Sequence, residues 1–490
     1  MHQILSLPIL FPILAGAVML ILRPTSRRLR NLLLMASVLL TTAFALTGIL
    51  LSYRLGGDAL SCVLVSFSTW LSISLKIDGL SMVYGTIVAV LWPLITVYSI
   101  KYMEHEGQES RFFGFWLIAF GVVNGIAFSQ DFLSLYFFYE LLTLSTLPLV
   151  MHAMDHKARY AGKQYIIYSM TGAGLGFISM MYLLTVCQQF DFTPGGMLIP
   201  GTPPDRVLLV MFLMGFFGFG VKAAIFPFHG WLLSASVAPT PVTALLHAVA
   251  VVKAGVFAVF RLTYYCYGTE VLYGTWAQTV AAVFAAITVV YASCRALRSP
   301  HLKRRLAYST VANLSYILLG ATMMTPAGLI AAVLHMLFHA VNKITLFFCA
   351  GAVFYRTGKE YVYEIAGFGR KIMPVTMFCF TVTGLGLMGI PPLTGFISKW
   401  RLGTAAADTG LPIGYLAAGA LVLAALLAAL YIITVVFLVY FPSEDQLPDI
   451  TENRDPNWMM KVPLLSLTVI AVMLSLLGAP LTQLLTGLLS

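Results

Sequence analysis

The chain has 490 residues, of which 59% are hydrophobic and only 10% are charged, and its formal net charge is +10. Because an average soluble domain carries about 25% charged residues, this composition excludes a soluble fold. The positive net charge does not indicate nucleic-acid binding, since the Lys and Arg of a membrane protein first report which loops face the cytoplasm.

The apolar residues gather into runs long enough to cross a bilayer, which takes about 20 residues. Fourteen such runs lie near residues 3–22, 31–52, 79–99, 112–129, 131–151, 164–186, 207–232, 240–262, 276–295, 306–323, 327–354, 373–398, 412–440 and 462–487. We therefore predict an all-α integral membrane protein. The first run has no charge before it and four arginines, at positions 23, 27, 28 and 30, after it. This is the reverse of a cleavable signal peptide, so the run is expected to remain as a helix.

The loop charges predict an orientation. If the N-terminus lies outside, most loop Lys and Arg fall on the cytoplasmic side, and only Arg54, Lys76, Arg206, Arg261 and Arg401 fall on the outer side or its edge. The positive-inside rule then predicts a multi-pass protein of the cell membrane with both termini on the outer side. The acidic stretch 443–455 is expected to be a solvated loop between the last two spans.

Two patterns that could suggest a cofactor have simpler interpretations. The six cysteines are scattered without a Cys-x-x-Cys pair, so they predict ordinary buried thiols rather than a metal centre. Gly172, Gly174 and Gly176 lie within an apolar run and follow no strand, so they indicate close helix packing rather than a nucleotide loop. We expect no cofactor in this chain.

Five ionisable side chains lie inside the predicted spans: Glu140, Lys222, Lys253, Lys343 and Lys399. A lysine at the centre of a membrane helix costs about 2.5–3.5 kcal/mol, and such residues usually mark ion pathways. Snorkelling to the interface is an alternative that fits Lys399, which is close to the end of its run. For the set as a whole, the cost indicates a row of ion-conducting groups.

Histidines extend this row along the eleventh run. His335, His339 and Lys343 follow at a spacing of four, so they share one helix face over about 12 Å at 1.5 Å per residue. Imidazole titrates near neutral pH and can pass a proton through its two nitrogens, which favours a proton relay over simple helix–helix hydrogen bonding. Haem ligation is a weaker alternative. Two histidines one turn apart cannot hold opposite faces of one iron, and the opposing ligand would have to be His247 or His229.

Proline breaks accompany two of the buried lysines. Pro227 follows Lys222 by five residues, and Pro391 and Pro392 precede Lys399. A proline inside a span removes a backbone hydrogen bond, and interrupted helices in corresponding positions of two halves point to the ion site of a transporter. We therefore expect these two spans to be broken helices beside the ion pathway.

With these motifs, the chain resembles the antiporter-like subunits of respiratory complex I (NADH:quinone oxidoreductase), their relatives in membrane-bound hydrogenases, and the A-type and D-type subunits of Mrp Na+/H+ antiporters. The motifs are Tyr139-Glu140-Leu141 and residues 222–231, 239–247, 303–310, 335–343 and 389–399. The resemblance covers essentially the whole chain. Both His247 and Lys253 are present where family branches tend to show one or the other, and Ser234 stands where members often have an aspartate. The ending of the chain looks more like the D-type Mrp subunits or the medium-length subunits than the largest complex I subunit.

The resemblance implies fourteen helices, in which helices 4–8 and 9–13 form two inverted five-helix repeats with broken helices 7 and 12. It divides the chain into helices 1–3 (residues 1–110), a first repeat (111–262), a second repeat (263–440), and a loop with helix 14 (441–490). It also implies ion-translocating roles: Glu140 and Lys222 as the ion pair of the first half-channel, His247 and Lys253 as the link onward, His335, His339 and Lys343 as the central relay, and Lys399 as the terminal lysine.

The function that the resemblance implies is movement of protons, or of sodium and protons, through two linked half-channels of a multisubunit membrane complex. The chain has no redox motif and no nucleotide loop, so the drive is expected from other membrane subunits, as in an oxidoreductase or an Mrp antiporter. A stand-alone secondary transporter and a quinone- or haem-binding redox protein are the alternatives.

Overall fold

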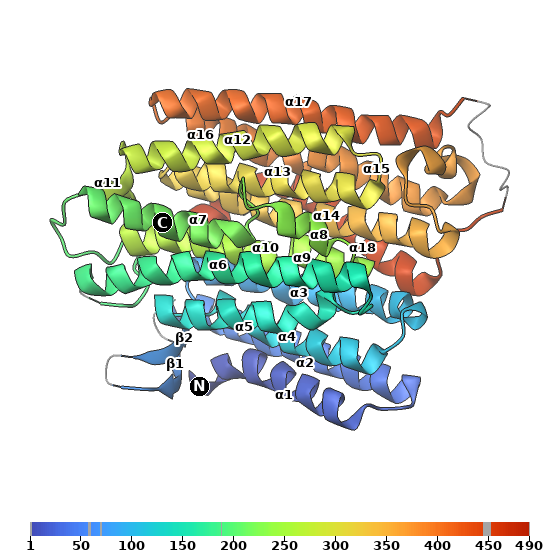
Figure 1. Ribbon diagram of the computed structural model, residues 1–490, viewed down its shortest axis with the longest axis horizontal. Helices are drawn as coiled ribbons and strands as arrows, with labels where there is room; N and C mark the ends of the chain where they lie inside the picture. Colours follow the sequence, from blue (N-terminus) through green and yellow to red (C-terminus); the bar gives the residue numbers. More distant parts are fainter. Residues whose placement is uncertain (1, 57–59, 69–70, 188, 444–451, 490) are drawn as a thin grey trace.

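The structure is a computed structural model that describes residues 2–56, 60–68, 71–187, 189–443 and 452–489. Long helices lie side by side along one direction (Figure 1). Within the described ranges, eleven of them are long and apolar enough to cross a membrane. The chain is therefore a multi-pass, all-helical membrane protein, as its composition predicts. Most of the expected acidic loop at 443–455 lies outside the described residues.

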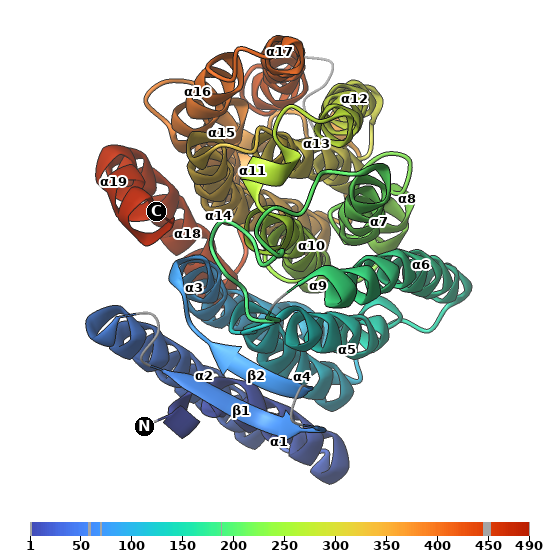
Figure 2. The same ribbon diagram turned by 90° about the vertical axis from the view of Figure 1, so that its left-hand side faces the viewer.

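The elements of the first half follow the expected runs. In chain order they are η1 (His2–Ser6), α1 (Leu7–Leu22), α2 (Arg27–Leu55), β1 (Ser61–Ser66), β2 (Ser72–Lys76), α3 (Gly79–Tyr102), η2 (Met103–His105), α4 (Glu109–Ala127), α5 (Phe132–Val150), α6 (His156–Val186), α7 (Arg206–Lys222) and α8 (Gly230–Ala235). β1 and β2 form an antiparallel hairpin that the sequence analysis did not predict. The hairpin lies at the end of the bundle that also carries η1 and α19 (Gly478–Leu489) (Figure 2).

The elements of the second half continue as α9 (Thr240–Ala248), α10 (Val251–Phe260), η3 (Arg261–Tyr267), α11 (Thr269–Leu272), α12 (Trp276–Arg298), α13 (Leu302–Thr322), α14 (Pro326–Thr357), η4 (Val362–Ile365), η5 (Phe368–Ile372), α15 (Pro374–Met388), α16 (Thr394–Ala407), α17 (Pro412–Tyr440), α18 (Trp458–Leu476) and α19. Helix α14 runs through the centre, with 89% of its apolar window buried. This position explains why a polar stripe on α14 is shielded from the surroundings.

Four of the expected spans are interrupted helices. One of them, the run 462–487, was expected to be a single helix but divides at Leu477 into α18 and α19. The runs 207–232 and 373–398 divide into α7 and α8 and into α15 and α16, at the predicted proline breaks. The run 240–262 was expected to be continuous, but it divides into α9 and α10. The hydroxyl of Tyr84 on α3 donates to the carbonyls of Val249 and Ala250 at 3.2 Å each. A partner from a distant helix therefore satisfies this break, which no proline or glycine marks.

The glycine-rich segment of α6 packs closely against α7. A Cβ added at Gly172 would lie 2.6 Å from the carbonyl oxygen of Gly218, and one added at Gly218 would lie 2.6 Å from the amide nitrogen of Gly176. Since real Cβ atoms do not approach so closely, side chains at these positions would push the helices apart. The packing interpretation is confirmed for Gly172 and Gly176, whereas a Cβ added at Gly174 would meet no atom within 4 Å.

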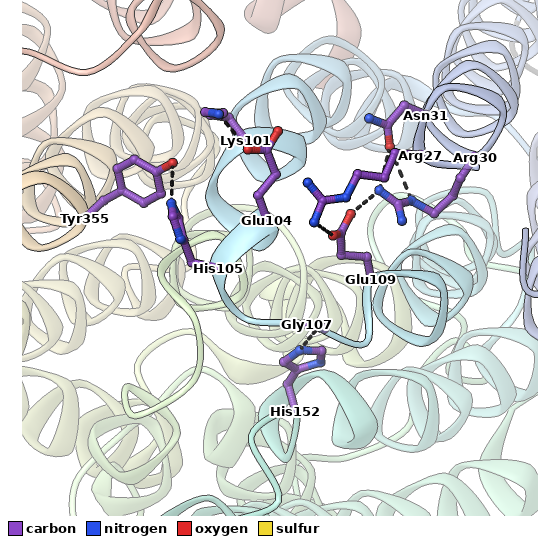
Figure 3. A network of polar contacts seen from close by, with 10 residues as sticks. All are labelled: Arg27, Arg30, Asn31, Lys101, Glu104, His105, Gly107, Glu109, His152 and Tyr355. Atoms are coloured by element: carbon purple, nitrogen blue, oxygen red, sulfur yellow. Dashed lines mark hydrogen bonds and ion pairs between the residues drawn. The ribbon is translucent and has the colours of Figure 1, made fainter. Parts of the chain in front are cut away.

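A buried ion pair connects α2 with α4 at one end of the bundle. Arg30, with the more exposed Arg27, pairs with the buried Glu109 at the start of α4 (Figure 3). Nearby, the ring of His105 hydrogen-bonds the hydroxyl of Tyr355 at 2.9 Å, which joins η2, directly after α3, to α14. These contacts lie at the end of the bundle where most loop cations gather.

Arg261 was expected in a loop on the outer side or at its edge, but its side chain is buried. It is 1% exposed and forms two hydrogen bonds, of 2.5 and 2.8 Å, with the carboxylate of Asp78. Its guanidinium also lies 4.5–5.0 Å from the ring centres of Phe192, Phe257 and Tyr265. Arg261 is buried because the N-cap carboxylate of α3 and an aromatic enclosure compensate its charge.

Candidate functional site

The stripe on α14 is buried and is bonded to three neighbouring helices. His335, His339 and Lys343 are each 2% exposed or less. The two ring nitrogens of His335 lie 2.8 Å from the hydroxyl of Ser398 on α16 and 3.1 Å from the side-chain oxygen of Asn313 on α13. His335 therefore connects the centre of the bundle with the residue that precedes Lys399.

His339 is the contact between α14 and α10. Its Nδ1 lies 2.7 Å from the ammonium nitrogen of Lys253, which is 0% exposed, and its Nε2 has no hydrogen-bond partner among the described residues. Lys253, Lys343, His335 and His247 all act electrostatically on His339. We call these five residues the central cluster.

The other two members of the central cluster bind to uncharged groups. The ammonium of Lys343 donates to the carbonyl of Leu306 on α13 at 2.9 Å. The Nε2 of His247 on α9 lies 3.2 Å from the hydroxyl of Ser236, whereas its Nδ1 is buried without a partner in the described part of the chain. The ring centre of Phe347 lies near both, 5.9 Å from the nitrogen of Lys343 and 4.9 Å from the imidazole centre of His247.

Lys399 extends the row to the broken helix of the second half. Its ammonium donates to the carbonyls of Leu387 and Met388, at 2.9 and 3.0 Å. The N–H groups that would normally bond these carbonyls belong to the residues four positions later, and these are Pro391 and Pro392, which have none. Lys399 therefore replaces two missing helix bonds. Its ammonium points to the break, which differs from the snorkelling alternative.

Lys222 and Glu140 lie close together without forming the expected ion pair. The ammonium of Lys222 donates to the backbone carbonyl of Tyr139 and lies 3.4 Å from the centre of the Tyr139 ring. The carboxylate of Glu140 interacts electrostatically with Lys222. However, one of its oxygens is buried without a hydrogen-bond partner among the residues described. The backbone carbonyl and the ring of Tyr139, the residue before Glu140, hold the ammonium instead.

The eight candidate residues thus fall into two electrostatic groups. Glu140 and Lys222 form the first, and the central cluster with Lys399 forms the second, since Lys399 acts on His335 and Lys343. The groups meet through the backbone. A Cβ added at Gly255, two residues after Lys253, would lie 2.5–3.0 Å from atoms of Lys222 and Ala223.

Sequence reasoning missed the polar side chains that position the row. Ser236, Asn313 and Ser398 are ordinary serines and an asparagine within helices or beside them, and no spacing distinguishes them from other polar residues of the chain. The only signal was adjacency, since Ser398 directly precedes Lys399. Both nitrogens of His335 are engaged by these residues, which does not favour the haem-ligand alternative.

Comparison with known proteins places this geometry in a family. The family described as "NADH:quinone oxidoreductase/Mrp antiporter, TM" matches residues 129–428, and "NADH-Ubiquinone oxidoreductase (complex I), chain 5 N-terminus" matches residues 58–113. NADH-quinone oxidoreductase subunit N of Desulforudis audaxviator is 30% identical over 425 residues, which cover 84% of this chain and 83% of that subunit.

Another relative is a subunit of a Na(+)/H(+) antiporter. Na(+)/H(+) antiporter subunit A1 of Staphylococcus aureus is 30% identical over 347 residues, which cover 67% of this chain but only 42% of that longer subunit. Two solved structures share the fold: the Mrp complex from Dietzia sp. (TM-score 0.87, 22% identity, 100% of this chain and 97% of that chain) and the archaeal membrane-bound sulfane sulfur reductase (TM-score 0.87, 24% identity, 99% and 96%). The chain belongs to the NADH:quinone oxidoreductase/Mrp antiporter family of antiporter-like membrane subunits.

Proposed function

We propose that this chain is the ion-translocating, antiporter-like subunit of a multisubunit membrane complex, and that it moves protons, or sodium and protons, along the two groups described above. The observation that carries the proposal is the buried Lys253–His339 contact. It joins two helices through titratable side chains and leaves Nε2 of the imidazole without a hydrogen-bond partner among the described residues. An imidazole that receives a proton at one nitrogen can release one from the other, so His339 is placed to relay a proton along α14.

The wider architecture of the proposal follows the family. We assign fourteen spans and two inverted repeats, in residues 111–262 and 263–440, between helices 1–3 (residues 1–110) and a C-terminal segment (441–490). The interrupted pairs α7/α8 and α15/α16, each with a lysine at the break, support this assignment. We also place the protein in the cell membrane with both termini outside. The N-terminal helix η1 and the end of α19 lie at the same end of the bundle, so the two termini share one side, as that orientation requires (Figures 1 and 2).

The energy scale of the row suits ion movement. Moving one charge across 100 mV costs about 2.3 kcal/mol. A hydrogen bond to a charged group contributes about 1.5–3 kcal/mol, so exchanging one partner for another is energetically comparable with the membrane potential. The chain has no redox or nucleotide motif, and we assign the drive to other membrane subunits. The relatives named above belong to an oxidoreductase and to an antiporter, which supports such an assembly.

A double-mutant cycle on Lys253 and His339 tests the proposal. Lys253→Met and His339→Leu should each slow ion movement in vesicles that contain the assembled complex. The double variant should be no slower than the worse single variant, because both changes interrupt one path. A pH-sensitive dye reports protons and a sodium-sensitive dye reports sodium, so the two arms identify the ion. Lys163→Met, at an exposed position of α6, is the control.

Transport at the parent rate in both single variants, with normal assembly on native gels, would remove the central relay from the mechanism. Losses that multiply in the double variant would instead assign separate roles to the two residues.

A further inference from the structure

A cavity of about 620 Å³ opens where α6 and α13 begin, at the end of the bundle opposite the hairpin. Basic side chains from two elements line it: Lys157 from α6, and Lys303 and Arg304 from α13. His156 and His301 stand at its edge, and Glu360 is its only carboxylate within the described ranges. None of the eight residues of the ion row lines this cavity.

The cavity carries uncompensated positive charge. Lys303 is the least exposed of the three basic residues: burial lowers its pKa to about 8, and Glu360 and Glu106 partly offset that effect. Lys157 and Arg304 carry the unpaired charge, since the described contact of Glu360 within 4 Å is with His301, at 3.8 Å. No carboxylate pairs with Lys157 or Arg304 in the described part of the chain. Salt bridges do neutralise Arg30 and Arg261 elsewhere. Convergent cations without counter-ions indicate a site for an anion.

The same cavity has an apolar side. Leu233 and Val237 line it, and Val237 is 50% exposed. Tyr160, which is 55% exposed, stands beside the cations. Tyrosines and basic residues at the ends of apolar helices are the groups that meet lipid headgroups. A free inorganic anion would use the cations but would leave this apolar side unfilled.

We propose that the cavity binds the phosphate-bearing headgroup of an anionic phospholipid. Arg presents a planar fork and Lys a point charge to phosphate oxygens, and basic pockets between membrane helices suit such headgroups. The acyl chains then lie along the apolar side beyond Val237. Ser236 also lines the cavity and contacts His247, so the bound headgroup lies beside the ion row. Binding is nevertheless measured independently of transport.

Photo-crosslinking of the intact purified complex tests this assignment. A photoactivatable phosphatidylglycerol should label peptides around residues 156–160 and 233–237, whereas the matching phosphatidylcholine should not. Replacing Lys157, Lys303 and Arg304 together by Gln should weaken phosphatidylglycerol binding roughly a hundredfold, because each basic side chain near an anionic lipid contributes about fivefold. Glu360→Gln, which removes the opposing charge, should strengthen binding several-fold.

The matched control replaces Arg159, Lys163 and Arg298 by Gln. These three are exposed at the same end and do not line the cavity, so the net charge changes equally and binding should stay at the parent level. If the cavity variant does not assemble, the single exposed change Arg304→Gln should still lower binding about fivefold.

Equal labelling by the two lipids, or equal loss in the cavity and control variants, would overturn the proposal. Complete displacement of the lipid by millimolar inorganic phosphate would assign the cavity to a free anion instead.

Discussion

Replacement of Lys399 separates a proton-transferring role from a structural one. Lys399→Met removes the donor to the carbonyls of Leu387 and Met388. Two hydrogen bonds from a charged group are worth about 3–6 kcal/mol together, at about 1.5–3 kcal/mol each. Removing a membrane-buried lysine recovers about 2.5–3.5 kcal/mol. The difference predicts a net effect between a gain of about 0.5 and a loss of about 3.5 kcal/mol of stability, together with loss of transport.

Lys399→Arg discriminates between the two roles. The side chain faces a cavity of about 570 Å³ between α16 and α17, which leaves room for a guanidinium. Arginine keeps the charge and the donors but does not release its proton. We expect Lys399→Arg to have the thermal stability of the parent complex and to be unable to release protons. The readouts are thermal unfolding of the purified complex and dye-detected proton movement in vesicles. Proton movement at the parent rate in the arginine variant would show that Lys399 only holds the break together.

Three further changes probe other parts of the chain. Glu140→Gln should leave assembly nearly intact on native gels but abolish coupled transport in vesicles, and full transport would remove Glu140 from the pathway. Gly255→Ala should slow transport, because the new methyl would displace the backbone of the α7 break, whereas Gly174→Ala, which meets no atom within 4 Å, should not. Glu109→Gln should lower the stability measured by thermal unfolding by about 3–5 kcal/mol, because it leaves Arg30 buried and unpaired; an unchanged unfolding temperature would contradict this reasoning.

The fold was largely predictable because membrane helices obey a length rule. Apolar runs of about 20 residues determine where helices lie, and each expected run contains helical structure. The break at Val249 and Ala250 could not be predicted, since the hydroxyl that bonds its two carbonyls belongs to Tyr84 on the distant α3. The hairpin was also missed. Its strands have six and five residues, and such short segments give a weak signal beside long apolar runs.

The sequence predicted the lysines that lie inside the bundle, but it did not predict which group each of them contacts. The cost of burying a lysine identified Lys222, Lys253, Lys343 and Lys399 without a structure. Which group receives each ammonium depends on the directions of side chains from separate helices, and a spacing along one helix does not contain that information. One partner was encoded locally: the two prolines at 391 and 392 deprive two known carbonyls of their donors, so Lys399 could have been assigned to them from the sequence.

Three lysines of the row differ from two buried arginines in the kind of partner they bind. Lys222, Lys343 and Lys399 donate to backbone carbonyls, whereas Arg30 and Arg261 bind carboxylates. Separating a buried ion pair leaves an uncompensated charge and costs about 3–5 kcal/mol, which exceeds the work of about 2.3 kcal/mol against 100 mV. Exchanging a carbonyl partner costs only about 1.5–3 kcal/mol. Carboxylate partners therefore suit cations that fix helices, and carbonyl partners suit cations that must change their contacts during each transport cycle. On this reasoning Lys222, Lys343 and Lys399 have partners that suit the translocating roles proposed for them, and Arg30 and Arg261 have partners that suit a structural role.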